Sequence, residues 1–89
     1  IGLENSLRVY PNPSDLSHTF FSINPGRPGT LTIRLYDITG KLVHHHTASY
    51  SGSEAAWSLP DLSYLPAGIY TLEVTDREKV REICRVIRQ

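Results

Sequence analysis

The chain has 89 residues, and its nine lysines and arginines balance nine aspartates and glutamates, so its formal net charge is zero. A chain of this length buries roughly 60–70% of the surface that its unfolded form exposes, which allows one domain with one modest core. The zero net charge argues against a protein that binds nucleic acid or an anionic membrane. Cys84 is the only cysteine, which excludes an internal disulfide and a metal site of paired cysteines. No stretch approaches the roughly 18 consecutive apolar residues of a membrane helix.

The N-terminal part predicts two short strands separated by a rigid corner. Residues 6–10 and 19–24 alternate apolar and polar side chains, which is typical of strands with one dry face. Pro11 and Pro13 cannot donate to a sheet ladder, so they end the first strand. Residues 25–29, Pro-Gly-Arg-Pro-Gly, predict a loop. The side chains expected to face inward on the two strands are Leu7, Val9, Phe21 and Ile23.

The middle of the chain predicts a hairpin and a short strand. Residues 30–37 alternate clearly, and residues 41–48 are expected to return as the partner strand. The connection Asp37-Ile38-Thr39-Gly40 predicts a type I turn in which Gly40 takes the left-handed conformation. A polar loop over 49–54 is then expected to lead into a strand over 55–59. The expected inward side chains are Leu31, Ile33, Leu35, Leu59 and Trp57, the last being the largest core candidate.

Residues 65–74, which follow a crossover over 60–65, predict the central strand of the fold. The stretch reads Leu-Pro-Ala-Gly-Ile-Tyr-Thr-Leu-Glu-Val, and it alternates strictly from Tyr70 onward. Pro66 restricts its own backbone, and Gly68 suits a turn with positive φ, so the entry to the strand is well specified. The side chains expected to face inward are Tyr70, Leu72 and Val74.

The end of the chain predicts a polar turn over 76–79 and a closing strand over 79–88. Cys84 and Val86 share one face and are the favoured inward pair, but Ile83 and Ile87 occupy the other. A bulge in this strand and apolar neighbours on both faces therefore both stay open as explanations. Seven short strands without helical periodicity predict an all-β fold, an antiparallel β-sandwich of immunoglobulin-like size.

The sequence offers little that points to catalysis or to a metal. His44 and His46 would point the same way on a strand, but nothing places a third ligand beside them, so we favour a solvated strand face. The catalytic and phosphate-binding motifs with known spacing are absent from the sequence. We therefore expect no enzyme activity, no cofactor and no metal.

Two groups of side chains are candidates for binding. Tyr36 and Tyr50 are the expected exposed aromatic pair, which a carbohydrate-binding module would use as a platform. The last strand carries a basic cluster, and a charged edge that discourages aggregation would explain it equally well. This cluster consists of Lys79, Arg81, Arg85 and Arg88.

Three segments, in order, resemble the C-terminal sorting domain of the type IX (Por) secretion system. The first is like the family's Tyr-Pro-Asn-Pro start, the second like its central hairpin and the third like its Pro-x-Gly-x-Tyr segment. The residues that carry the resemblance are Tyr10, Pro11, Asn12 and Pro13, then Asp37 and Gly40, then Pro66, Gly68 and Tyr70. The last strand departs from the family, because it uses arginine where the family usually has lysine and includes Glu82 and Cys84.

The resemblance implies a single immunoglobulin-like domain over residues 1–89, of which 1–5 would be a remnant of the linker to an N-terminal cargo domain. Such a domain is exported through the periplasm to the outer-membrane surface or the medium. An outer-membrane translocon and its shuttle protein recognise it, and a sortase-like cysteine peptidase removes it and can join the cargo to anionic lipopolysaccharide. Cleavage would lie at or before Ile1.

Within that resemblance we expect the translocon to read the turn of the central strand together with the last strand. The residues predicted for this contact are Pro66, Gly68, Tyr70, Lys79, Arg81, Arg85 and Arg88. An exposed last strand would also allow a weak dimer, although a monomer is equally compatible. The alternatives are a non-catalytic carbohydrate-binding or fibronectin-like module of a secreted hydrolase, and a structural spacer.

Overall fold

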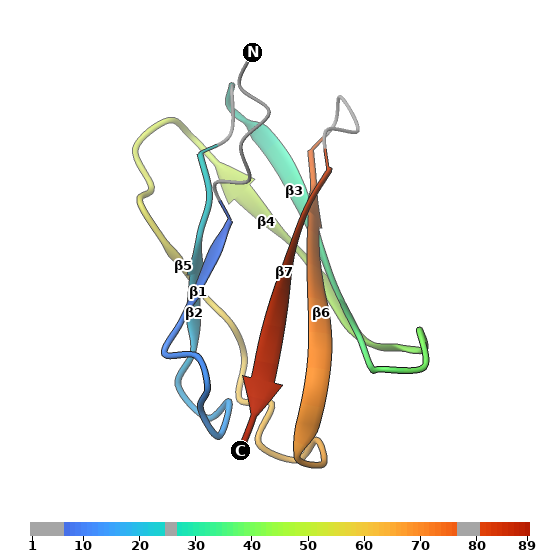
Figure 1. Cartoon of the computed structure of the whole chain (residues 1–89). Helices are drawn as coiled ribbons and strands as arrows, with labels where there is room; N and C mark the ends of the chain where they lie inside the picture. The colour runs from blue at the N-terminus through green and yellow to red at the C-terminus, as the bar shows by residue number, and fades with distance from the viewer. Residues whose placement is uncertain (1–6, 25–26, 77–80) are drawn as a thin grey trace.

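The computed structural model describes residues 7–24, 27–76 and 81–89, and within these ranges it consists of strands and loops without a helix (Figure 1). Accordingly, the described residues include no helix long and apolar enough to cross a membrane. Two antiparallel sheets face each other, with strand orders β1-β2-β5 and β4-β3-β6-β7. The predicted all-β sandwich is confirmed. The strands are β1 (Arg8–Tyr10), β2 (Phe20–Ser22), β3 (Gly29–Tyr36), β4 (Leu42–Tyr50), β5 (Trp57–Ser58), β6 (Gly68–Thr75) and β7 (Arg81–Arg88).

The core lies between the two sheets and is built mainly by alternate side chains of β3 and β6. The inward residues predicted on these two strands are all buried, as are those of the first strand, whereas Ile23 is only half-buried. Phe21, with no exposed surface, is the largest fully buried side chain. The connecting loops add three buried leucines that the alternation did not reveal. These are Leu16, Leu62 and Leu65.

β6 is an interior strand of the larger sheet, with β3 on one side and β7 on the other. Gly68 opens it with a φ of 157°, a conformation that residues with a side chain rarely adopt. The Tyr70 hydroxyl donates a hydrogen bond to the Pro66 carbonyl oxygen at 2.5 Å, which fixes the turn against the strand. The predicted stiff entry into a central strand is thus confirmed.

β7 pairs with β6 without a register shift from Gly68↔Arg88 to Thr75↔Arg81, so the suggested bulge in the last strand is absent. Cys84 and Val86 face inward, as favoured from the sequence, and burial raises the pKa of the Cys84 thiol. As a consequence of this register, Ile83 and Ile87 lie on the outer face, and each side chain is about two-fifths exposed.

The hairpin between β3 and β4 closes on the predicted turn, and Gly40 has the left-handed φ of 88°. The return strand contains a bulge that the sequence did not indicate. Tyr36 pairs with Leu42 whereas Leu35 pairs with His44, so Val43 is the extra residue. A bulge of one residue exchanges the faces of all later side chains. β4 also continues to Tyr50, two residues into the predicted loop over 49–54.

Trp57 packs against the core as predicted, but it is only half-buried, so Phe21 and not Trp57 is the largest fully buried side chain. Its ring stacks on Phe21 with centroids 5.4 Å apart, and its indole N–H donates to the Ser49 carbonyl oxygen at 3.1 Å. The indole must reach this acceptor at the rim of the sandwich, so the ring cannot lie in the dry centre.

Candidate recognition surface

Three segments that are distant in the sequence meet at the end of the sandwich that carries the C-terminus (Figure 1). They are the loop after β1, the crossover that leads to β6, and the last residues of β7. The backbones of Leu62 and Leu16 are joined by a hydrogen bond of 2.9 Å, and the backbones of Ser14 and Ile87 by one of 3.1 Å. Two of the three segments that resemble the sorting family therefore pack around the final strand.

Asn12 takes the place of a neighbouring strand on the outer edge of β7. Its side-chain nitrogen Nδ2 donates to the Arg85 carbonyl oxygen at 2.8 Å, and its Oδ1 accepts the Ile87 amide at 2.9 Å. An asparagine amide can do both because it carries a donor and an acceptor. Ser14 continues the pairing, since its carbonyl oxygen accepts the Gln89 amide at 2.8 Å. The expectation of an exposed last strand is therefore wrong for residues 85–89, whose backbone edge is covered.

Arg88 stabilises the crossover from inside the domain. Its guanidinium donates to the carbonyl oxygens of Leu65, at 3.1 Å, and Ser63, at 2.7 Å, and it also contacts the Gln89 carbonyl oxygen. Tyr70 is buried as well, so the side chains of Arg88 and Tyr70, both predicted for recognition, are engaged in contacts within the domain. Pro66 and Gly68 are exposed, Arg81 begins β7, and Lys79 lies outside the described residues.

Arg85 differs from Arg88 because its side chain points to the outer face of the larger sheet and is exposed. Within the described part of the chain its guanidinium has neither an ion pair nor a hydrogen bond. It lies across from Thr71, and the next pair toward the C-terminus on the same face of the sheet is Ile69 with Ile87. Arg85 and these two isoleucines, together with Ile83, two residues earlier on β7, form what we call the outer-face patch. The patch consists of Ile69, Ile83, Arg85 and Ile87.

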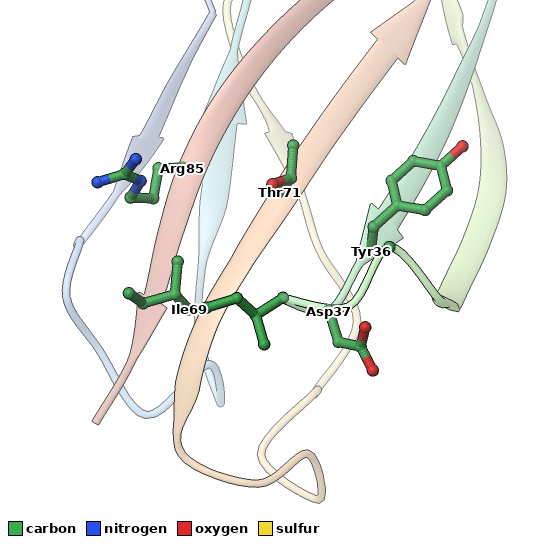
Figure 2. A pocket seen from close by; sticks show the side chains of 7 residues that line it. Tyr36, Asp37, Ile69, Thr71 and Arg85 are labelled. Atoms are coloured by element: carbon green, nitrogen blue, oxygen red, sulfur yellow. The ribbon is translucent and has the colours of Figure 1, made fainter.

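An open pocket of about 450 Å³ adjoins this patch. Figure 2 shows Ile69 and Thr71 on β6 between Arg85 on β7 and Tyr36 on β3, with Asp37 at the lower margin. The Asp37 carboxylate forms no ion pair with Arg85 in the described part of the chain, and it accepts hydrogen bonds within its own turn. The Thr39 hydroxyl donates at 2.6 Å, and this bond and that from the Lys41 amide lower the pKa of Asp37. The patch therefore combines apolar surface with an uncompensated cation.

The histidines of β4 do not form the expected solvated face. The bulge at Val43 turns His44 and His46 inward, where both are half-buried, and leaves His45 exposed. Their rings share a hydrogen bond of 2.8 Å between His44 Nε2 and His46 Nδ1. Burial is the main cause that lowers the pKa of both imidazoles, and the nearby histidines add to it. Among the described residues, no group of three side chains could hold a metal ion.

Tyr36 and Tyr50 do not form an exposed aromatic pair, so that prediction is wrong. Both are half-buried, and they lie at opposite ends of the β3–β4 ladder. The Tyr36 hydroxyl donates to Glu73 Oε1 at 3.3 Å, and the Tyr50 ring packs against Trp57. The two tyrosines therefore do not share a surface that could serve as the suggested glycan platform.

The fold and the site define a small antiparallel sandwich domain whose larger sheet carries exposed apolar and cationic side chains beside an open pocket. A family model described as a secretion system C-terminal sorting domain matches residues 8–88, which is nearly the whole chain. The chain belongs to this family and has the role of a secretion sorting signal. Membership implies export across the outer membrane in a type IX secretion context.

The fold is shared with a protein of known structure. It is PorZ of Porphyromonas gingivalis, described as an essential bacterial surface component of the type IX secretion system. The TM-score is 0.61 at 18% sequence identity, and the match covers 91% of this chain but 11% of that one. This similarity shows the fold alone. Comparison with curated proteins finds no match.

Proposed function

We propose that the folded domain is a non-catalytic signal that directs an N-terminal cargo through the type IX translocon. The outer-face patch would make the contact. The observation that carries this proposal is the exposed Arg85, which has no ion-pair partner among the described residues, beside exposed isoleucines. Apolar area provides affinity, and a rim cation provides orientation and a faster encounter with a partner of opposite charge.

The same proposal explains why the family motifs lie where they do. Asn12 and Arg88 hold β7 in a single register, so Ile83, Arg85 and Ile87 are presented together only when the domain is folded. We further propose that the shuttle protein of the system takes part in this recognition. A sortase would then remove the domain, and the cargo would reach the outer-membrane surface or the medium.

The test is export of a periplasm-targeted fluorescent reporter that carries residues 1–89 at its C-terminus. It is measured in a type IX-competent bacterium and in a strain without the translocon. Wild-type reporter should leave the cell only in the competent strain, and Arg85→Glu should be retained. Arg8→Glu is the matched control, because Arg8 is an exposed cation on the other sheet and the substitution makes the same change of charge.

Retention of the wild-type reporter in both strains would refute the sorting role in that host. Export of Arg85→Glu at the wild-type level would leave the role intact but would refute the outer-face patch as its contact. Urea unfolding of each variant distinguishes a lost contact from a lost fold.

A further inference from the structure

The larger sheet has two edge strands, and they differ in their protection. The β7 edge is covered by Asn12 and Ser14 over its last residues. On the outer side of β4, the described residues supply one hydrogen bond, at the C-terminal end of the strand, where the Ser49 carbonyl oxygen accepts the indole N–H of Trp57. The Ser49 carbonyl oxygen therefore points away from β3. Its direction identifies which residues of β4 direct their backbone groups away from the sheet.

In an antiparallel pair, every second residue directs both its N–H and its C=O away from the partner strand. Ser49 is such a residue, so His45 and Thr47 on the same strand are also. No hydrogen bond from the described part of the chain reaches the outward backbone groups of His45 and Thr47. We call these two residues the β4 edge.

The β4 edge also lacks the usual devices that prevent pairing with another chain. Such edges normally carry lysine or other charges, a proline or a bulge. Residues 42–50 read Leu-Val-His-His-His-Thr-Ala-Ser-Tyr, with no lysine, arginine, aspartate, glutamate or proline. The bulge at Val43 precedes the open residues and leaves them in regular register with β3.

The size of this edge decides between possible occupants. Two residues offer two donors and two acceptors, so a pairing there buries far less than the roughly 1,200 Å² of a stable complex between proteins. β5 lies on the same side, because Trp57 reaches Ser49 from there, which restricts the approach of a second sandwich. A single extended segment needs neither a large area nor a wide approach.

We propose that the β4 edge accepts an uncharged, extended segment of a protein of the export machinery as an added antiparallel strand. The inference rests on the proposed function for the identity of the partner. Strand addition draws affinity from backbone hydrogen bonds and selectivity from alternate side chains. Because β4 has no lysine, arginine or carboxylate, a charged residue opposite it would find no cross-strand partner, so β-branched and apolar residues fit best.

The first test is a titration of the isotope-labelled domain, followed by nuclear magnetic resonance. The probe is an acetylated and amidated copy of 29–36, the strand that pairs with β4 inside the domain, with threonine in place of Arg34. Amide shifts should be centred on His45 and Thr47. Thr47→Pro should raise the Kd about fivefold or more, because it removes one outward donor and spares the bonds to β3. Thr47→Val keeps the donor and is the control.

The second test places the same two variants in the export reporter, where Thr47→Pro should be retained and Thr47→Val exported. Absence of shifts at His45 and Thr47, or equal export of the two variants, would overturn the proposal. A concentration-dependent dimer that Thr47→Pro abolishes would also overturn it, because a second copy would then be the occupant. If the wild-type reporter is not exported, the proposed function fails, and the titration alone decides whether the edge accepts a strand.

Discussion

Replacing Asn12 with alanine should loosen the last strand without touching the core. The substitution removes the two hydrogen bonds that the side chain makes to the backbone of β7, at Arg85 and Ile87. Asn12 is exposed, so water can satisfy the freed backbone groups and no buried polar atom is left unpaired. The loss is therefore the net worth of two hydrogen bonds, about 1–2 kcal/mol of the free energy of unfolding.

In a domain of this size, that loss corresponds to a fall in Tm of about 5–15 °C. With an m-value of about 1 kcal/mol/M, the urea midpoint should fall by about 1–2 M. Asn12→Asp should lie between alanine and wild type, because it keeps the acceptor for the Ile87 amide but places an oxygen against the Arg85 carbonyl.

Urea unfolding monitored by Trp57 fluorescence measures these changes, and hydrogen exchange of the Ile87 amide reports the strand directly. Ser58→Ala is the control, since Ser58 is exposed on β5, and it should change stability by less than about 0.5 kcal/mol. An Asn12→Ala variant as stable as this control, with unchanged exchange at Ile87, would refute the view that the asparagine secures β7.

Three further changes test other contacts. Burial holds the pKa of His44 and His46 below the ordinary 6.5, so the unfolded chain binds more protons as the pH falls through that value, and stability should decrease between pH 7.5 and 5. The double variant His44→Gln/His46→Gln should flatten this pH dependence in urea titrations, whereas His45→Gln should keep it. Arg88→Met should lower the free energy of unfolding by about 1–3 kcal/mol. Arg88→Lys should also be less stable than the wild type, because an ammonium group lacks the planar fork that reaches two carbonyl oxygens. Wild-type stability of Arg88→Lys would contradict this. Gly40→Ala should cost about 1–2 kcal/mol in thermal unfolding through its φ of 88° alone, since an added Cβ would meet no atom within 4 Å, and a neutral result would show that the turn relaxes.

The sequence determined the features that depend on neighbours along the chain. Strict alternation on β3 and β6 is enough to define an inside, because successive side chains of a strand point to opposite faces. The turn at Gly40 and the entry at Pro66 and Gly68 follow from backbone preferences of single residues. The motifs that identify the sorting family are likewise short runs of adjacent residues, so the order of amino acids suffices to recognise them.

The tertiary structure alone decided the features that depend on distant partners. The bulge at Val43 follows from how β4 pairs with β3, and it turns two histidines from the solvent to the interior. Whether β7 has a free edge depends on Asn12, which lies 75 residues before Ile87 in the chain. Alternation assigns a side chain to one of two faces, but it does not reveal which strand edge another segment covers. In this domain such a segment covers the end of β7 and leaves the β4 edge open.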